Sequence, residues 1–509
     1  MIRQIATVSA GTLASRLLGF VRDTLMASLL GAGGAADAFL FAFQLINVAR
    51  RLLSEGAFNA MLVPAFLRIR QTEGEDAAKN FAGGVLGTTT TVLVGVTILF
   101  GLVMPYVVNL LAPGFARHDS HDFAITTARL MLPYLAFVGP VAVIMALLNA
   151  EGRVAQSAFT PLLFNVFLIL VIVGLLMTRP ADPATAAMIL ATTVGAAGLA
   201  QACVLAFPGA TMARPIKLSA NADVLQLLRR TLPGALAQSG PQLLVVAGAI
   251  AASLTPGSVA AIYFANRLIE LPLGIVGVAA GTVVLTRIAD STLRDEADAH
   301  ALQSQAVESA AALALPAAIG LAVLAQPIVR LLFQHGAFTA EDAERTALVL
   351  AILCIALPAH ALTKILAPAL FARENFRFPL IAMLAGLAIT IVAAIALQAR
   401  YNEAGVAAAI ALGAWVSAIV LTVMLAALKQ VALVRGTLRR LAQVVLAAAV
   451  MGAVLYVARI AVEVDQVERL PALAGSVAAL IAFGLLLYLG LLQLSGVFRV
   501  NDLTRALRK

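Results

Sequence analysis

Four arginines lie inside long apolar segments, away from the segment ends: Arg16, Arg22, Arg50 and Arg267. A guanidinium offers a planar fork of donors that matches the paired oxygens of a phosphate or a carboxylate. A charge at the centre of a bilayer costs about 2.5–3.5 kcal/mol on insertion scales, so each of these arginines needs a partner or an aqueous cavity. The four arginines therefore predict a cavity that binds an anionic substrate.

Other charged residues accompany these arginines, and we expect them to hold the arginines in place or to act as gates: Asp23, Asp37, Arg51, Glu55 and Glu270. Arg16, Gly19 and Asp23 are spaced i, i+3, i+7, so they share one helical face. Arg267 and Glu270 are spaced i, i+3, which predicts an ion pair within one helix.

The remaining basic residues of the apolar segments are interpreted differently. Lys364 follows His360 by one helical turn and is a further candidate to support the cavity. Arg129, Arg330 and Arg345 lie nearer to segment ends, where long side chains can extend to the lipid headgroups. At the interior positions, basic side chains outnumber acidic ones, which favours an anionic substrate.

The composition requires a lipid environment for most of the surface. The chain is 61% hydrophobic and 12% charged, with a mean hydropathy of +0.98, whereas a soluble domain is about 25% charged. Apolar runs of about 18 residues or more can cross a hydrocarbon core, and they must be helical because lipid offers the backbone no partner. We predict an all-α polytopic membrane protein with about fourteen transmembrane helices, over residues 5–30, 35–66, 81–106, 124–149, 157–178, 184–208, 231–254, 258–286, 305–333, 343–370, 378–399, 404–428, 438–461 and 471–494.

Basic residues in the loops predict the orientation of these spans. With the N-terminus inside, the cytoplasmic loops and the C-terminal tail hold most of the Lys and Arg that lie outside the spans. This positive-inside pattern predicts that both termini are cytoplasmic. It also accounts for most of the net charge of +9, and no basic tract is interleaved with aromatic residues, so we expect no nucleic-acid partner.

An internal repeat relates the two halves of the chain at a nearly constant offset. The matching pairs are 41–46 with 264–269, 105–115 with 327–338, and Pro133 with Pro358. Six spans per copy is an even number, so the copies share one orientation and form a parallel repeat. We therefore predict two six-helix lobes around a central cavity, over 1–222 and 223–430, and two extra spans in 431–509. Rocking of one lobe against the other would give alternating access, although a duplicated scaffold or receptor is an alternative.

Several kinds of chemistry find no support in the sequence. The two cysteines, Cys203 and Cys354, lie in apolar runs, and the histidines of the loops lack ligand spacing, so we expect no metal and no cofactor. The glycine run over 31–34 lacks the preceding strand and the following Lys-Ser/Thr of a phosphate-binding loop, so we interpret it as a tight turn. We find no nucleophile–base pair and no ATP-binding domain. The sequence indicates a transporter and not an enzyme.

Six segments together identify a family resemblance: Ser15–Asp23, Gly31–Phe39, Arg50–Phe58, Asn266–Glu270, Phe333–Thr339 and Lys364–Pro368. They resemble the MurJ (MviN) lipid II flippases, of the multidrug/oligosaccharidyl-lipid/polysaccharide exporter superfamily. The resemblance extends from the first span to about residue 380 and is looser beyond. The arginine-bearing segments are specific as a set, whereas any one of them alone is a weak signal.

The resemblance implies a bacterial inner-membrane protein of peptidoglycan synthesis, which moves lipid II from the cytoplasmic to the periplasmic leaflet. Lipid II is an undecaprenyl-diphosphate-linked disaccharide-pentapeptide. By their motifs, the family's cavity arginines correspond to Arg16, Arg22, Arg50 and Arg267, whose natural counterpart is the diphosphate. The two extra spans would help to form a groove for the lipid tail. The implied partners are lipid II and membrane lipids, with other cell-wall synthesis proteins as further candidates.

The sequence departs from the family at specific places and leaves alternatives open. Gln44 stands where many members have Lys, and Asn266 where some have Asp. Residues 231–254 and 378–399 contain no acidic residue, so we expect no sodium site there, and the energy source stays open. The alternatives are export of another polyprenyl-linked glycan or a drug, and a non-transporting scaffold for cell-wall synthesis enzymes.

Overall fold

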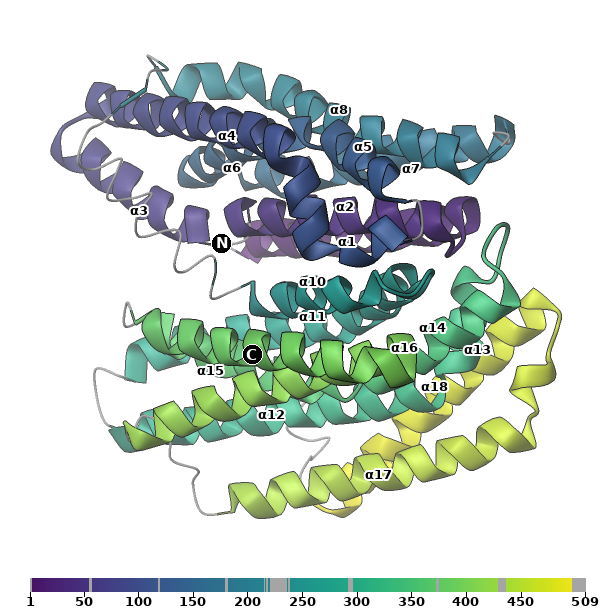
Figure 1. The fold of residues 1–509 in the computed structure, drawn as a ribbon. Coiled ribbons are helices and arrows are strands. Elements are labelled where there is room, and N and C mark those ends of the chain that lie inside the picture. The colour runs from purple at the N-terminus through teal and green to yellow at the C-terminus, as the bar shows by residue number, and fades with distance from the viewer. Residues whose placement is uncertain are drawn as a thin grey trace. The chain divides into compact units, whose positions relative to one another are not determined.

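The computed structural model describes residues 2–54, 57–117, 120–178, 182–214, 216, 218–219, 236, 239–291, 296–371, 375–428 and 436–496. These residues form α-helices and two short 3-10 helices, without a strand among them (Figure 1). This confirms the predicted all-α membrane fold. A helix satisfies most of its polar backbone groups internally, as a hydrocarbon environment requires.

Within the described part of the chain, nine helices are long and apolar enough to cross a membrane, or ten if the bent pair Ala340–Leu353 and Ala356–Ala367 forms one span. Helices α1 (Ile2–Leu30) and α2 (Gly34–Ser54), which hold most of the predicted site, are not among these nine. The full count of fourteen stays a prediction.

The chain forms two compact units, of which unit 1 comprises Met1–Ala260 and His335–Phe338. Besides α1 and α2, its elements are α3 (Ala57–Thr72), α4 (Glu75–Leu111), η1 (Pro113–Arg117), α5 (His121–Met131), α6 (Pro133–Ala150), α7 (Val154–Thr178), α8 (Pro183–Met212) and α10 (Gly240–Ala252). Helix α1 packs along α7, and α6 packs between α4 and α8 (Figure 1). The contact between α1 and α7 is the one that positions the candidate site.

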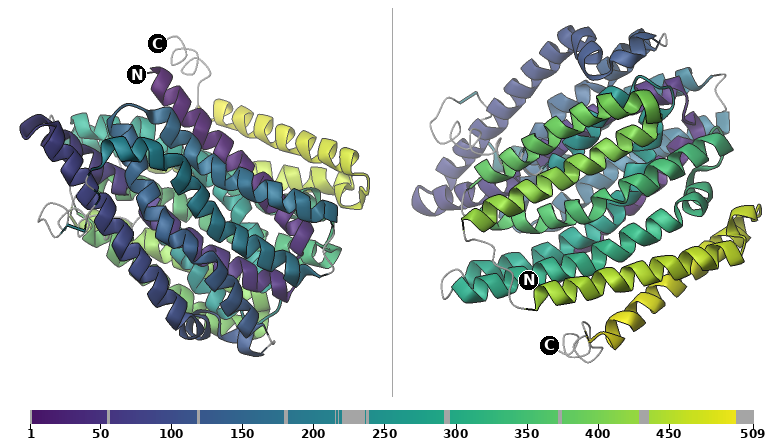
Figure 2. Two further views of the ribbon diagram at one scale, coloured as in Figure 1. Left: turned by 90° about the horizontal axis from the view of Figure 1, so that it is seen from above. Right: turned by 60° about the horizontal axis from the view of Figure 1, so that its bottom comes forward.

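Unit 2 comprises Ala261–Gln334 and Thr339–Lys509. Its elements are α11 (Ser258–Ser291, from Ala261 onward), α12 (Glu296–Val323), α13 (Ala325–Phe333), α14 (Ala340–Leu353), α15 (Ala356–Phe371), α16 (Arg377–Ala427), α17 (Thr437–Ala461), η2 (Val464–Gln466) and α18 (Leu470–Leu494). Helices α17 and α18 lie side by side, and α17 packs on α12 (Figure 2). The predicted lobe boundary at 222 lies within 220–235, outside the described residues, so the predicted lobes stay a prediction.

Helix α16 contains two predicted spans, 378–399 and 404–428, as the arms of a hairpin. Its helical backbone is broken at Asn402, where φ is 48° and ψ is −131°. The arms approach through glycines, because a Cβ at Gly386 would overlap Ser417 Oγ and one at Gly413 would overlap Thr390 Oγ1. Small residues allow this close contact, which provides van der Waals attraction where lipid removes the hydrophobic driving force.

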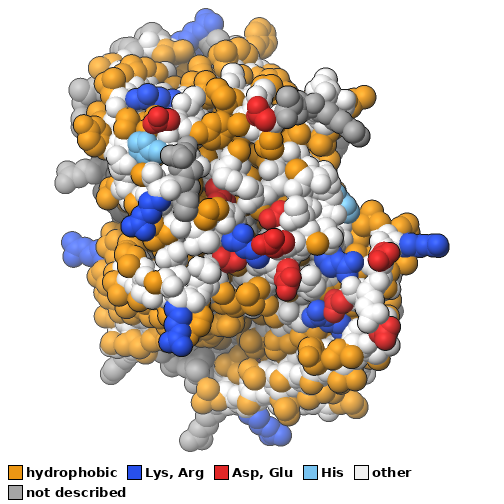
Figure 3. All heavy atoms as spheres, turned by 45° about the vertical axis from the view of Figure 1, so that its right-hand side comes forward, with side chains coloured by type: hydrophobic (Ala, Val, Ile, Leu, Met, Phe, Trp, Pro, Cys, Tyr) orange, Lys and Arg blue, Asp and Glu red, His pale blue; other side chains and the backbone are white. Residues whose placement is uncertain are grey.

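Large apolar side chains cover much of the protein's exterior, as expected for a surface in contact with lipid. Leu102, Tyr106 and Leu486 are 70%, 75% and 71% exposed, and hydrophobic side chains spread over much of the face in Figure 3. In water a contiguous apolar surface of this kind would drive association. The protein is therefore an integral membrane protein.

We expect Gly413→Ala to lower the free energy of unfolding by about 1–3 kcal/mol, because the added methyl group overpacks the hairpin. Thermal unfolding of the purified protein in detergent measures this effect. Gly475→Ala in α18 is the matched control, since a Cβ there meets nothing within 4 Å. Equal melting temperatures for the two variants would contradict close packing of the arms.

Candidate functional site

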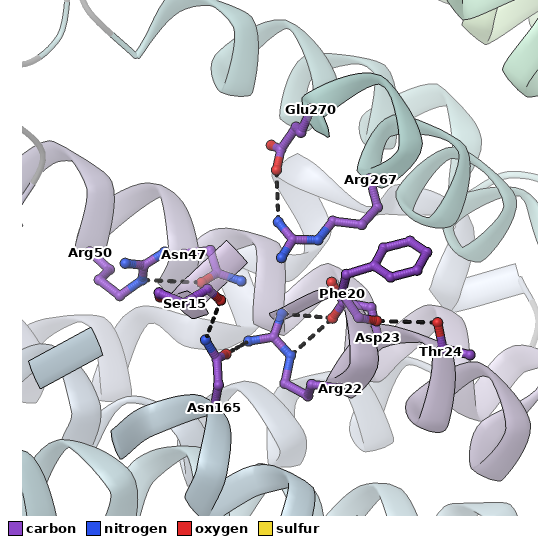
Figure 4. Close-up of polar contacts among 10 residues, drawn as sticks. All are labelled: Ser15, Phe20, Arg22, Asp23, Thr24, Asn47, Arg50, Asn165, Arg267 and Glu270. Carbon is purple, nitrogen blue, oxygen red and sulfur yellow. Dashed lines mark hydrogen bonds and ion pairs between the residues drawn. The ribbon is translucent and has the colours of Figure 1, made fainter. Parts of the chain in front are cut away.

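Arg22 is buried in unit 1 and bound on several sides. Its Nε and Nη2 donate to Asp23 Oδ1 at 2.9 and 2.6 Å, and its Nη1 donates to Asn165 Oδ1 at 2.8 Å (Figure 4). Arg22 is 5% exposed and Asp23 is fully buried. The carboxylate neutralises the guanidinium locally, which allows both charges to remain inside the protein.

Two aromatic rings complete the surroundings of Arg22. The guanidinium carbon lies 5.0 Å from the ring centroid of Phe43 in α2 and 5.7 Å from that of Phe164 in α7. A cation over an aromatic face is attracted by the ring quadrupole, more strongly where water is absent. Three helices therefore hold the Arg22 side chain in one position.

Asn165 is the residue of this site that the sequence analysis missed. Its Oδ1 accepts from Arg22, and its Nδ2 donates to the Ser15 carbonyl at 3.1 Å, so it joins α7 to two turns of α1. Asn165 is 6% exposed. An amide side chain alone in the apolar run 157–178 was the available signal, because a buried polar group in a span needs a partner.

Arg16 and Arg50 differ from Arg22 in exposure. Arg16 is exposed, and it forms no hydrogen bond or ion pair with another residue that the structure describes. Arg50 is half-buried, and its Nε donates to Asn47 Oδ1 over 3.4 Å, a long bond. Arg51 is also half-buried in α2. Arg22 is therefore buried and firmly bound, whereas Arg16 is exposed and Arg50 and Arg51 are half-buried.

Arg16 and Asp23, which the spacing places on one face of α1, differ in exposure in the structure. Arg16 is exposed, whereas Asp23 is buried and bound to its chain neighbour Arg22. The Arg22 side chain is long enough to reach the carboxylate of the adjacent residue, and helical periodicity does not predict an ion pair between chain neighbours. Glu55, predicted as a charge partner, lies within 55–56, outside the described residues.

Asp37 binds the start of a helix. Its Oδ2 accepts from the Gly257 N–H at 2.6 Å and its Oδ1 from the Ala260 N–H at 2.8 Å, at the beginning of α11. Asp37 is 2% exposed. The first N–H groups of a helix are unpaired and carry a partial positive charge, so a carboxylate is a strong partner for them.

Two further contacts tie unit 1 together near the ends of α1 and α4. The Ala337 N–H donates to the Ser28 carbonyl at 2.8 Å, and the Gly114 N–H donates to Ser253 Oγ at 3.0 Å. Gly31 has a φ of +65° and forms the predicted tight turn; a Cβ there would lie 2.6 Å from the Ala337 oxygen. Glycine is therefore required at Gly31 by both its backbone conformation and the neighbouring chain.

In unit 2, the predicted pair of Arg267 and Glu270 forms within α11. Arg267 Nη1 donates to Glu270 Oε2 at 2.8 Å, and each side chain is 20% exposed (Figure 4). Lys364 is half-buried on α15, one turn after the buried His360. Helix geometry alone brings Arg267 and Glu270 together, because residues three apart lie on the same side.

The arginines that we expected to extend to the headgroups have protein partners. Arg345 pairs with Glu403 at 2.7 Å. Arg129 Nε donates to the Gly101 carbonyl at 2.9 Å. Pro105 follows Gly101 by four residues in α4 and has no N–H, so Arg129 satisfies the carbonyl that the proline leaves without its helical partner.

The sequence matches the family described as "Lipid II flippase MurJ" over residues 26–469. It is 37% identical over 467 residues to a probable lipid II flippase MurJ of Rhizobium meliloti, covering 90% of this chain and 86% of that protein. It is 30% identical to the lipid II flippase MurJ of Burkholderia cenocepacia, covering 83% of each.

The fold is also similar to solved structures. A lipid II flippase MurJ in an inward closed conformation aligns with a TM-score of 0.78 at 21% identity, covering 98% of this chain and 99% of that one. An inward-facing multidrug resistance MATE transporter aligns with a TM-score of 0.67 at 18% identity, covering 84% and 99%. At these identities, the likeness concerns the fold alone.

Replacing Asn165 with Leu should lower the free energy of unfolding by about 1–3 kcal/mol, because it leaves Arg22 with an unsatisfied buried donor. Thermal unfolding in detergent measures the loss. Asn109→Leu is the control, since Asn109 is exposed and its side chain is hydrogen-bonded to the partly exposed His121. A loss no larger than that of the control would show that Asn165 does not hold Arg22.

Asp37→Ala should speed hydrogen exchange at the Gly257 and Ala260 amides by roughly tenfold or more, because charge-assisted hydrogen bonds to both are lost. Exchange followed by mass spectrometry measures this effect. Asp37→Asn keeps one acceptor and should give a smaller increase. Unchanged exchange in the alanine variant would mean that the carboxylate does not hold this helix start.

Proposed function

Because the chain belongs to the lipid II flippase MurJ family, we propose that it moves lipid II from the cytoplasmic to the periplasmic leaflet of the inner membrane. The chain is accordingly a transporter and not an enzyme. The observation that carries the proposal is the family match over residues 26–469, which includes all of α2, α7 and α11. Lipid II and membrane lipids are the partners that this function requires, and other cell-wall synthesis proteins are further candidates.

We propose that the arginines of α1, α2 and α11 bind the diphosphate of the substrate. Arg16 and Arg50 are the best candidates for direct contact, since Arg16 is exposed and Arg50, which is half-buried and bonded to Asn47, is less buried than Arg22. Arg22 is held by Asn165 and by Asp23, which neutralises it locally, so in this proposal it offers the substrate its remaining N–H groups. Arg267 shares its charge with Glu270 and would exchange this partner for substrate.

Alternating access fits the contacts at one end of unit 1. Asp37, Gly114 and Ser28 bind residues of 239–260 and 335–338, which belong to the predicted second lobe. With cytoplasmic termini, the end of α1 at Ser28 lies at the periplasmic side. In this proposal these hydrogen bonds keep that side closed, and they break when the transporter opens outward.

Substitution of the accessible arginines tests the substrate role. Arg16→Ala and Arg50→Ala should each lower the rate of lipid II flipping by about tenfold or more, because a charge-assisted hydrogen bond to the diphosphate is lost. The measurement is lipid II translocation in reconstituted vesicles. Lysine at either position keeps the charge but lacks the planar fork, so an intermediate rate is expected.

The control is Arg469→Ala, at an exposed position before α18, which should leave the rate unchanged. Normal flipping by the alanine variants of both Arg16 and Arg50, in protein that inserts normally, would overturn the proposed substrate role.

An exporter of another polyprenyl-linked glycan or a drug is the alternative within the same fold, given the likeness to MATE transporters. A cavity for cationic drugs would use aromatic and acidic side chains, whereas this chain exposes Arg16. A scaffold should tolerate neutral residues at these arginines. Depletion of the protein, followed by identification of the lipid-linked precursor that accumulates in the inner leaflet, separates the three functions.

A further inference from the structure

Helix α12 contains a proline whose missing hydrogen bond is replaced from another helix. Pro316 has no N–H, so the Ala312 carbonyl four residues earlier loses its helical partner. The Tyr488 hydroxyl of α18 donates to this carbonyl at 2.9 Å. Tyr488 is 3% exposed, so no bulk water competes for the bond. Prolines are tolerated in membrane helices where a neighbouring group satisfies the freed carbonyl.

The α17–α18 hairpin contacts α12 on both sides of Pro316. Before the proline, Arg440 of α17 pairs with Glu308 at 3.2 Å. After it, Gly452 of α17 lies so close to Ile319 that a Cβ would overlap that side chain. Contacts on both sides of a proline restrict how far the helix can bend there, whereas contacts on one side would not.

The far end of α12 and the turn of the hairpin are also bound. Arg459 Nη1 donates to the Val323 carbonyl at 2.6 Å and Nη2 pairs with Asp465 at 2.8 Å. Arg330 of α13 donates to the carbonyls of Asp465 and Val467. A cation at the last carbonyls of α12 also complements the helix dipole. The hairpin is therefore fixed to the rest of unit 2 at its turn as well as along its length.

We propose that the α17–α18 hairpin determines the angle at which α12 bends at Pro316, with Tyr488 as the positioning residue. We call the hairpin in this role the splint. Helix α12 also packs against α15, the helix of Lys364, so its bend affects where this helix lies. The effect on transport rests on the proposed function, whereas the effect on the bend does not. The hairpin then has a mechanical role in addition to any contact with lipid.

A double-mutant cycle tests the splint. Tyr488→Phe removes the donor and should lower the melting temperature in detergent by about 2–4 °C. Pro316→Ala restores an N–H that can pair with Ala312 inside α12. In that background, Tyr488→Phe should have at most about a third of its original effect, because the carbonyl no longer depends on the hydroxyl. Tyr134→Phe, which removes the bond to Gln201 in unit 1, should act equally in both backgrounds.

A spectroscopic measurement reports the bend directly. Spin labels at residues 305 and 321, on either side of Pro316, should give a broader distance distribution in Tyr488→Phe than in the parent protein. In the Pro316→Ala background, the distributions with and without the Tyr488→Phe substitution should be identical. The splint would be overturned if Tyr488→Phe changed the melting temperature and the distance distribution equally in the parent protein and in Pro316→Ala. The ring of Tyr488 would then only fill space.

Lipid II flipping in vesicles completes the test. Tyr488→Phe should lower the rate about threefold, and the same change in the Pro316→Ala background should have little effect. If the bend measurements show the coupling while the parent protein does not flip lipid II, the proposed function fails and the splint stands. If the parent flips lipid II but the coupling is absent, the splint fails alone.

Discussion

Hydrocarbon offers no hydrogen-bond partner, so each polar group inside a membrane helix must find one within the protein, in water or in a substrate. Arg22 finds Asp23, Asn165 and two aromatic rings. Two carbonyls that lose their helical donor to a proline accept instead from side chains: that of Gly101 from Arg129 and that of Ala312 from Tyr488. The bonds of Asn165 and Tyr488 connect helices that are far apart in the sequence, and the packing within each unit depends on them.

The same constraint separates structural charges from charges that are available for function. Arg22 is buried and bound from three helices, and Asp37 is bound to the start of α11. Arg16 is exposed on α1, in a segment that the sequence predicts to be a membrane span. An exposed arginine in a membrane helix requires water or an anionic ligand beside it. The difference in exposure between Arg16 and Arg22 supports the proposed binding of a lipid diphosphate more than the number of arginines does.

Close packing in this protein relies on small residues and backbone contacts. Gly386 and Gly413 bring together the arms of α16, and Gly31 allows the chain around Ala337 to approach α1. Apolar side chains gain little from leaving lipid for a protein interior, so close contact and hydrogen bonds have to provide stability. Contacts of this kind can be remade in another arrangement at modest cost, which suits a protein that changes conformation during transport.

Relations between residues close in the chain could be predicted from the sequence, because helix geometry determines them. The apolar segments, the turn at Gly31 and the pair of Arg267 with Glu270 are of this kind. Pro316 likewise reveals from the sequence that a carbonyl lacks its helical donor. Only the tertiary structure decided that Tyr488 supplies the donor and that Asn165 binds Arg22 across 143 positions. Such contacts depend on which helices pack together and on how deep each residue lies in the membrane. Hydrophobic periodicity determines neither of these, because lipid and the protein interior are almost equally apolar.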